Sequence, residues 1–190
     1  DAVSVTLRSG TTGVLNYAFE NCEKLSSVTF SDNNLTFIGD SVFSGCKALN
    51  SVNLPTSVES IGDAAFYGCE ELTAITVPAK VTQINSYAFY NCKKLSSVTF
   101  EGQITSVEYG AFGNCAALTS VTFPDTLEYI GSAAFKGCNA LGGKLDLPAS
   151  LKRVDSEAFR ATAINILTVK GKTTIGNHAF GECLKLGGVA

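Results

Sequence analysis

Seven cysteines and one histidine are the residues of this chain that most readily suggest chemistry. Thiolates and imidazoles bind metals, and a Cys–His pair can serve as nucleophile and base. Zinc sites need cysteines about two to four residues apart. Here, neighbouring cysteines are separated by at least 23 residues. The spacing therefore argues against a metal site, and we expect the chain to bind no metal and no cofactor.

The other polar residues offer little support for catalysis. A catalytic base needs a positioned nucleophile and an orienting partner, and nothing in the sequence supplies them for His178. The adjacent carboxylates of Glu70 and Glu71 lie on a polar segment that is typical of a solvated face. Nucleotide-binding and hydrolase motifs are also missing from the sequence. We therefore interpret the chain as non-enzymatic, with no catalytic residue. An enzyme that uses His178 remains an alternative for assay.

Composition limits the possible partners. Hydrophobic residues make up 45% of the 190 residues, which is enough for a continuous core, and charged residues make up 16%. The net charge of −3 gives no electrostatic footprint for nucleic acid or for an anionic membrane. No apolar run approaches the ~18 residues of a membrane span. Methionine is absent, so we expect residues 1–190 to be a single domain excised from a longer protein.

A repeat of about 23 residues runs along the chain. Alanine precedes seven of its eight phenylalanines, and cysteine follows seven of them three residues later. The repeating unit reads L-x-x-V-x-F-P-x-x-V-x-x-I-G-x-x-A-F-x-x-C-x-x. Repeats this short bury their apolar faces against their neighbours, which predicts a solenoid with one long core. The phenylalanines that define the unit are Phe19, Phe43, Phe66, Phe89, Phe112, Phe135, Phe159 and Phe180.

Each part of the unit has a local interpretation. The V-x-F segment has a period of two and β-forming residues, which predicts a short strand, and the following proline ends it. The segment from I-G to A-F-x-x-C predicts one or two helical turns. Asp or Ser would cap its start, as at Asp40 and Ser86. A left-handed Gly or Asn would end it, as at Gly45 and Asn91.

All seven cysteines occupy one position of the repeat. Buried thiols behave as small hydrophobic groups, so the repetition predicts a structural spine rather than a reactive site. A single disulfide between neighbouring repeats remains an alternative, and Thr162 replaces the cysteine in one unit. The predicted spine consists of Cys22, Cys46, Cys69, Cys92, Cys115, Cys138 and Cys183.

The L-x-x-V-x-F segment resembles the strand segment of leucine-rich repeats. The 23-residue period, the A-F-x-x-C signature and the proline after the strand are similar to the BspA-like, or Treponema pallidum-type, class, from Val5 to Val189. The resemblance implies a right-handed α/β solenoid of about eight units. It would have a parallel β-sheet on its concave face and short strands and helical turns on the other sides. It also implies a group of bacterial and protist surface proteins, and some of its members are adhesins for fibronectin or fibrinogen.

The strand face offers candidate ligand-binding positions. Small polar residues recur beside the inward-facing positions and would form two rows on a flat, almost uncharged sheet. Such a face suits an extended protein or glycan, although Thr and Ser are also ordinary exposed strand residues. Lys144, Asp146 and Ile166 interrupt this series of small polar residues, so we expect ligand specificity to depend on these positions. The candidates are Thr29, Asn53, Thr76, Thr99, Thr122, Lys144, Asp146, Ile166 and Thr168.

Tyrosines outside the repeat framework form a second candidate patch. Tyr67 and Tyr90 directly follow the repeat phenylalanine in adjacent units, and Tyr87, Tyr109 and Tyr129 lie on related turns. Tyrosine is favoured at interfaces, although scattered exposed aromatics are also ordinary. The sequence thus predicts a protein-binding or adhesive module. The resemblance implies a location at the cell surface or outside the cell, and a partner that is a matrix or host surface protein, or a glycan. The alternative is a spacer or scaffold array whose ligand is bound by another domain.

Overall fold

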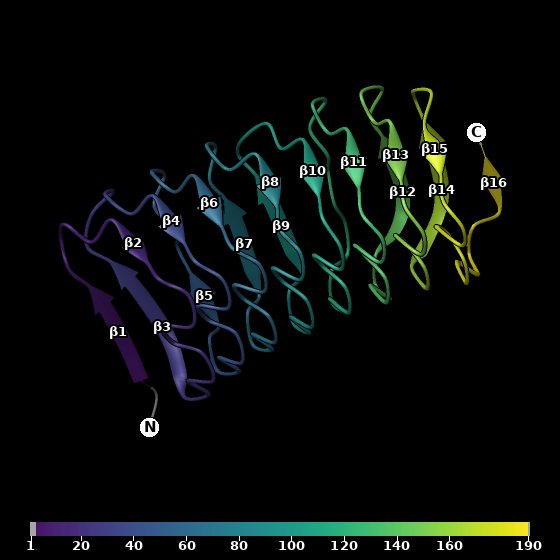
Figure 1. The fold of residues 1–190 in the computed structure, drawn as a ribbon. Helices are drawn as coiled ribbons and strands as arrows, with labels where there is room; N and C mark the ends of the chain where they lie inside the picture. Colours follow the sequence, from purple (N-terminus) through teal and green to yellow (C-terminus); the bar gives the residue numbers. More distant parts are fainter. Residues whose placement is uncertain (1–2, 190) are drawn as a thin grey trace.

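The computed structural model describes residues 3–189, which wind into a stack of coils with one coil for each repeat (Figure 1). All strand pairs are parallel, because equivalent residues of successive coils lie side by side. No helix long and apolar enough to cross a membrane is found within these residues. The predicted solenoid of stacked parallel strands is therefore confirmed.

The first strand row is formed by the L-x-x-V-x-F segments. Its register matches the repeat: Thr6 pairs with Thr29, Thr76 with Thr99 and Asp146 with Thr168. The row divides into three sheets, with strand orders β1-β3-β5, β7-β9 and β12-β14-β16. Its strands are β1 (Val3–Leu7), β3 (Leu25–Phe30), β5 (Ser51–Val52), β7 (Ala74–Val77), β9 (Ser97–Phe100), β12 (Gly142–Leu147), β14 (Ala163–Val169) and β16 (Gly188–Val189).

The first strand row is interrupted between β9 and β12. Residues 120–123 occupy the strand position of their coil but do not form a strand. The coils remain linked beside the interruption, because the Thr119 N–H donates to the Ser96 carbonyl at 3.3 Å. The Gly142 N–H in turn donates to the Thr119 carbonyl at 3.2 Å. Strand pairing is therefore interrupted at this coil, while backbone hydrogen bonds still join it to the coils on either side.

The second strand row comes from the V-x-x-I part of the unit and supplies the short strands expected outside the first row. In most of these two-residue strands the second side chain is buried, as Ile61 is after the exposed Ser60, whereas both residues of Thr174–Ile175 are exposed. They form two sheets, β2-β4-β6 and β8-β10-β11-β13-β15. The strands are β2 (Gly13–Val14), β4 (Phe37–Ile38), β6 (Ser60–Ile61), β8 (Gln83–Ile84), β10 (Ser106–Val107), β11 (Tyr129–Ile130), β13 (Arg153–Val154) and β15 (Thr174–Ile175).

A side chain bridges the gap between β6 and β8. In the preceding coil, the Gly62 N–H donates to the Ile38 carbonyl at 2.8 Å. One coil later, the Asn85 Nδ2 donates to the Ile61 carbonyl at 2.7 Å instead. An unpaired carbonyl in this part-buried position would carry a desolvation cost, so the Asn85 amide replaces the missing backbone donor.

The predicted helical turns are wrong, because no helix occurs within residues 3–189. The A-F-x-x-C segments form successive tight turns instead, which we call the turn edge. Tyr87 and Asn91 have φ angles of 56° and 61°, which a right-handed helix excludes. Between them, the Phe89 N–H donates at 2.8 Å to the Ala111 carbonyl of the next coil. The Tyr87 and Asn91 amides likewise bond to the next coil, so alternate amides of the segment join neighbouring coils.

The left-handed residues expected after each repeat phenylalanine are present. Asparagine and glycine tolerate positive φ better than other residues, which explains their recurrence at this position. The φ angles are 57° at Asn21, 72° at Gly45, 67° at Gly68, 61° at Asn91, 58° at Asn114 and 74° at Gly137. The expected Asp caps act between coils, because the Asp40 Oδ1 accepts from the Asp63 N–H at 2.9 Å.

Backbone–backbone hydrogen bonds between coils all run in one direction along the turn edge. Each coil donates N–H groups to the carbonyls of the following coil, as from Phe43 to Ala65 at 2.8 Å and from Phe159 to Ala179 at 2.7 Å. Bonds beside the strands run the opposite way, as from Gly131 to Val107 at 2.7 Å. The backbone hydrogen bonds at the turn edge and those beside the strands therefore connect the same coils in opposite directions.

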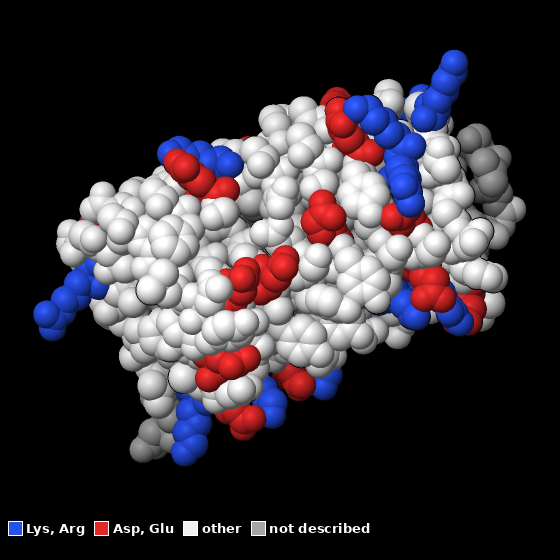
Figure 2. Space-filling view, viewed as in Figure 1, with Lys and Arg blue, Asp and Glu red and all other residues white. Residues whose placement is uncertain are grey.

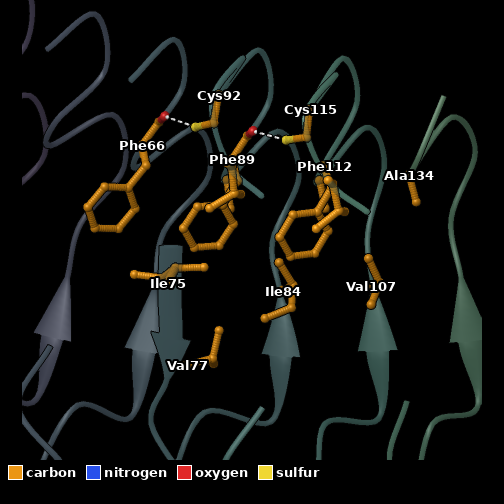
Figure 3. Close-up of a cluster of buried hydrophobic side chains, with 14 of the residues drawn as sticks. Phe66, Ile75, Val77, Ile84, Phe89, Cys92, Val107, Phe112, Cys115 and Ala134 are labelled. Carbon is orange, nitrogen blue, oxygen red and sulfur yellow. Dashed lines mark hydrogen bonds between the residues drawn. The ribbon is translucent and has the colours of Figure 1, made fainter. Parts of the chain in front are cut away.

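The repeat phenylalanines form a continuous stack through the core (Figure 3). Ring centroids of neighbours lie 5.1–5.6 Å apart, with rings nearly parallel in most pairs, for example at 5° between Phe89 and Phe112. Ile75, Val77, Ile84 and other strand residues pack against this stack. Each coil buries its apolar side chains against the coil before and the coil after, as the sequence predicts.

Candidate binding surface

The cysteines contribute packing and hydrogen bonds to the core. The Cys92 Sγ donates to the Phe66 carbonyl at 3.2 Å, and the Cys115 Sγ donates to the Phe89 carbonyl at 3.1 Å (Figure 3). All seven thiols are free. Burial raises the pKa of the Cys92 thiol well above its ordinary value and that of Cys138 to about 12. These thiols are protonated at neutral pH, which removes the thiolate that nucleophilic attack or metal binding requires.

The expectation that every cysteine is buried is wrong for Cys22, which is exposed. Cys22 belongs to the first coil, where Phe19 and Val5 line the same open hollow of about 520 Å³. The other six cysteines are buried. In the seventh unit the Thr162 hydroxyl takes the cysteine position and lies 3.2 Å from the Cys183 Sγ. A thiol is therefore covered where another coil packs over it.

His178 lies in an exposed turn with a φ of 54°. Within residues 3–189, no group of three or more His, Cys, Asp or Glu side chains is arranged to hold a metal ion. His178 and Cys183 thus lie in unlike surroundings, one exposed and the other buried. The geometry gives no observation that favours a Cys–His mechanism.

The candidate residues of the first strand row face solvent. Thr29, Asn53, Thr76, Thr99 and Thr122 are all exposed at equivalent positions of successive coils. Thr76 and Thr99 are direct cross-strand neighbours in β7 and β9. Since these side chains are small and uncharged, they form an uncharged face over several coils. Thr29 and Thr168 lie near opposite ends of the row, so they share one face but cannot share one small ligand.

The row is hollowed rather than flat where residues 120–123 leave the strand pattern. A hollow of about 380 Å³ lies between Thr99 and Thr122, and a second of about 190 Å³ separates Thr122 from Lys144 and Asp146. The flat face expected from the repeat is therefore wrong at this point. The interruption brings Thr99, Thr122, Lys144 and Asp146 around two adjoining depressions.

The charged break in the first strand row forms a local ion pair. The Lys144 Nζ lies 3.0 Å from the Asp146 Oδ1, on an exposed part of β12. The hydrogen bond with Lys144 lowers the pKa of the Asp146 carboxyl, and Thr168 and Lys170 act in the same direction. Ile166 pairs with Lys144 across the strands and is 44% exposed. An exposed aliphatic side chain beside an ion pair distinguishes this end of the row chemically.

Four of the five candidate tyrosines form one aromatic cluster on the turn edge. Tyr67 and Tyr90 stack with centroids 5.3 Å apart, and Tyr87 meets Tyr109 edge to face at 5.0 Å. Tyr129 points elsewhere, since its hydroxyl donates to the Asp155 Oδ2 at 2.6 Å. Burial and that hydrogen bond raise the pKa of Tyr129 to about 12. The cluster therefore consists of Tyr67, Tyr87, Tyr90 and Tyr109, which we call the tyrosine cluster.

Sequence reasoning missed the residues that complete this patch. Gly110, Asn114, Lys136 and Glu157 line a hollow beside the tyrosine cluster. Gly110 and the nearby Gly113 lie one repeat after Tyr87 and Tyr90, at the same two repeat positions. This spacing was the available signal that the glycines lie beside the tyrosines. Lys136 and Glu157 gave no such signal, because only the stacking of four coils brings them to the tyrosines.

Charge is unevenly distributed over the molecule. Figure 2 shows carboxylates scattered over the middle of one face, with basic side chains mainly toward its margins and wide uncharged areas between them. Many charges pair between coils, as in Lys47–Glu23 at 2.6 Å and Lys152–Glu128 at 2.6 Å. Exposed pairs of this kind contribute at most about 1 kcal/mol each. The surface thus offers mostly uncharged contacts to a partner.

The repeat pattern and the stacked coils define a leucine-rich-repeat protein. The chain matches the BspA type leucine rich repeat region over residues 2–118 and 59–187, with six copies. It therefore belongs to the BspA-type leucine-rich-repeat family. Among curated proteins, none matches the chain.

Solved structures with the same architecture come from several bacteria. A leucine rich cell surface protein of Faecalibacterium prausnitzii is 26% identical, with a TM-score of 0.73 over 98% of this chain and 60% of that one. A leucine-rich repeat protein of Eubacterium ventriosum is 31% identical, with a TM-score of 0.77 over 86% of this chain and 44% of that one. The leucine-rich repeat protein of T. pallidum, at 24% identity, a TM-score of 0.65 and coverage of 98% of this chain and 78% of that one, shares the fold.

Proposed function

We propose that the chain is a non-enzymatic binding module that attaches a cell surface or secreted protein to a protein ligand. The exposed first strand row carries this proposal, because it offers uncharged side chains at equivalent positions of successive coils from Thr29 to Thr122. Extended proteins can lie across such a row and insert side chains into depressions like those beside Thr122. The similarity to a cell surface protein of F. prausnitzii supports the proposed location.

The contact would centre on the interrupted part of the row. A standard protein interface covers ~800 Å² on each partner, which requires several coils rather than one. The depressions around Thr122 lie in the middle of that span, and the Lys144–Asp146 pair and Ile166 lie at its margin. Charged groups at a margin steer and select a partner, whereas the central contacts supply most of the affinity.

The test is binding to immobilised fibronectin, fibrinogen and mucin, measured by surface plasmon resonance. We expect one of them to bind, and a chain with Thr76→Arg, Thr99→Arg and Thr122→Arg to lose at least tenfold in affinity. Three adjacent guanidinium groups would fill and charge the face that the ligand must cover.

A matched control places three arginines on the second strand row, at Ser60, Gln83 and Ser106. Arg153 occupies the equivalent position naturally, so the row tolerates this side chain. The control chain should bind as the unmodified one does. Equal loss in both chains would place the contact elsewhere, and no binding to any of the three probes would favour the spacer alternative.

A further inference from the structure

The tyrosine cluster is a local departure from the repeat. Tyr67 and Tyr90 take a turn position where other coils have Glu20, Ser44, Gly113, Lys136, Arg160 or Gly181. Tyr109 takes a position that is otherwise Asn, Asp or Ser. Neither position belongs to the core, and Tyr67 and Tyr109 are 39% and 47% exposed. Solenoid packing therefore does not require these aromatic rings.

Two glycines allow the rings to lie close against the next coil. A Cβ at Gly110 would lie 2.9 Å from ring carbons of Tyr87, and one at Gly113 would lie 2.7 Å from ring carbons of Tyr90. Such distances are too short for a real contact, so a side chain at either position would displace a ring. Gly110 also has a φ of 60°. The two tyrosines and the two glycines therefore fit one another across neighbouring coils.

The rings form one wall of a hollow of about 220 Å³ on the turn edge. Tyr87 and Tyr90 meet at 80° with centroids 5.4 Å apart, which gives the wall two differently oriented faces. Pockets for drug-sized ligands measure roughly 300–1,000 Å³, so this hollow suits one small ring.

The opposite side of the hollow is polar and electrically balanced. Asn114 Nδ2 donates to the Tyr90 hydroxyl oxygen at 2.9 Å, which leaves the hydroxyl hydrogen of Tyr90 free to be donated to a ligand. Lys136 Nζ lies 2.7 Å from Glu157 Oε2, and Arg160 also pairs with Glu157. These contacts lower the pKa of the Glu157 carboxyl, so it is ionised at neutral pH. A ligand of either charge would lie near a side chain of the same charge, because Lys136 and Arg160 are positive and Glu157 is negative.

We propose that this hollow binds one neutral sugar ring of a glycan. The electron-rich faces of aromatic rings attract the C–H groups on the face of a pyranose. The ring's hydroxyl groups both donate and accept, which matches the amide, phenol, ammonium and carboxylate on the polar side. The hollow lies on the turn edge, whereas the proposed protein contact lies on the first strand row. The two proposals can therefore fail separately.

The test uses saturation-transfer NMR and titration with methyl glycosides of glucose, galactose, mannose and N-acetylglucosamine. We expect at least one to bind with a Kd in the millimolar range, which is ~4 kcal/mol of binding free energy. Tyr87→Ser and Tyr109→Ser should each weaken it at least tenfold. Other coils carry Ser at both positions, as at Ser41 and Ser86, so the folded chain should tolerate these changes. Thermal melting checks that it does.

Tyr17→Ser is the matched control. Tyr17 occupies the same turn position as Tyr87, with a φ of 63°, and it lies outside the tyrosine cluster. Its removal should leave sugar binding unchanged, and so should the three arginines on the first strand row. Absence of binding to all four glycosides would overturn the proposal. Unchanged affinity in Tyr109→Ser, or tighter binding of sialic acid or tetramethylammonium than of any neutral sugar, would overturn it too.

Discussion

The stacked phenylalanines lead to a quantitative prediction about stability. Phe112 has 0% exposure and lies between Phe89 and Phe135, with centroid distances of 5.2 and 5.3 Å. Phe100 meets its edge at 6.4 Å. Replacing a buried phenylalanine by alanine costs about 3–5 kcal/mol, and Phe112 belongs at the upper end because both ring faces are covered. We therefore expect Phe112→Ala to lower the free energy of unfolding by about 5 kcal/mol.

Two further substitutions separate the contributions. Phe112→Leu keeps most of the apolar area but loses the ring pairs, which contribute ~0.5–1.5 kcal/mol each, so we expect a loss of about 2 kcal/mol. Phe180 is half-buried and stacks on Phe159 at 5.2 Å. With one stacked ring neighbour, Phe180→Ala should cost about 2 kcal/mol, roughly half of the usual loss at a buried phenylalanine.

Equilibrium unfolding in urea, followed by circular dichroism, measures these differences in a chain that has no tryptophan. With an m value of ~1–3 kcal/mol/M, a loss of 5 kcal/mol moves the midpoint by more than 1 M. The reasoning is refuted if Phe112→Ala and Phe180→Ala shift the midpoint equally, because the cost would then not depend on the neighbouring rings. A fall in m for Phe112→Ala alone would mean that the two halves unfold separately, as expected of weakly coupled repeats.

Three other outcomes can be checked. One thiol equivalent should react quickly with Ellman's reagent in the folded chain and disappear in Cys22→Ser, and fast reaction of a second thiol would contradict the buried spine. Asn85→Ala leaves the Ile61 carbonyl without its amide donor and should cost ~1–3 kcal/mol in urea unfolding, whereas an unchanged midpoint would mean that water replaces the amide. Lys136 lowers the pKa of Glu157, so this stabilisation is present above the unfolded pKa and lost as pH falls through the folded one. Glu157→Gln should therefore lower the melting temperature at pH 7 but not near pH 2, and an equal loss at both would contradict the ionic origin.

The repeating part of the structure could be predicted because each coil obeys the same constraints. Phe89, Cys92 and Val98 recur at fixed spacing, and fixed spacing specifies which residues lie side by side in a stack. The left-handed position was recognisable at Asn91, because few residues accept a positive φ. Register, strand positions and the apolar core follow from these facts.

The helical turns were mispredicted because local propensity competes with contacts between coils. A-F-x-x-C has the length and composition of a helical turn, but the Phe89 N–H gains a well-aligned acceptor in the next coil. Sequence reasoning also treated all seven cysteines alike, although Cys22 has a different environment. Both errors arise because contacts with neighbouring coils determine the structure, and the sequence of a single repeat unit does not describe those contacts.

The candidate sites could be predicted only in part. Exposed positions such as Thr76 follow from strand alternation, and Lys144 is recognisable because it breaks a row of small residues. The hollow beside the tyrosine cluster depends on how Tyr90, Gly113 and Glu157 are placed across four coils. Tyr90 and Gly113 share one repeat position, but Glu157 occupies another position two coils further on, so no local pattern marks the three as one site.

The one-directional backbone hydrogen bonds of the turn edge make the two ends of the solenoid chemically different. Each coil presents N–H groups toward the next coil and carbonyls toward the previous one, as Phe43 and Ala65 illustrate. A coil stacked in reverse would place donor against donor and acceptor against acceptor, and each unmatched group would carry a desolvation cost. Growth of such an array, by gene duplication or by end-to-end contact between molecules, is therefore restricted to head-to-tail addition. A two-fold symmetric dimer through the coil ends would leave these groups unpaired.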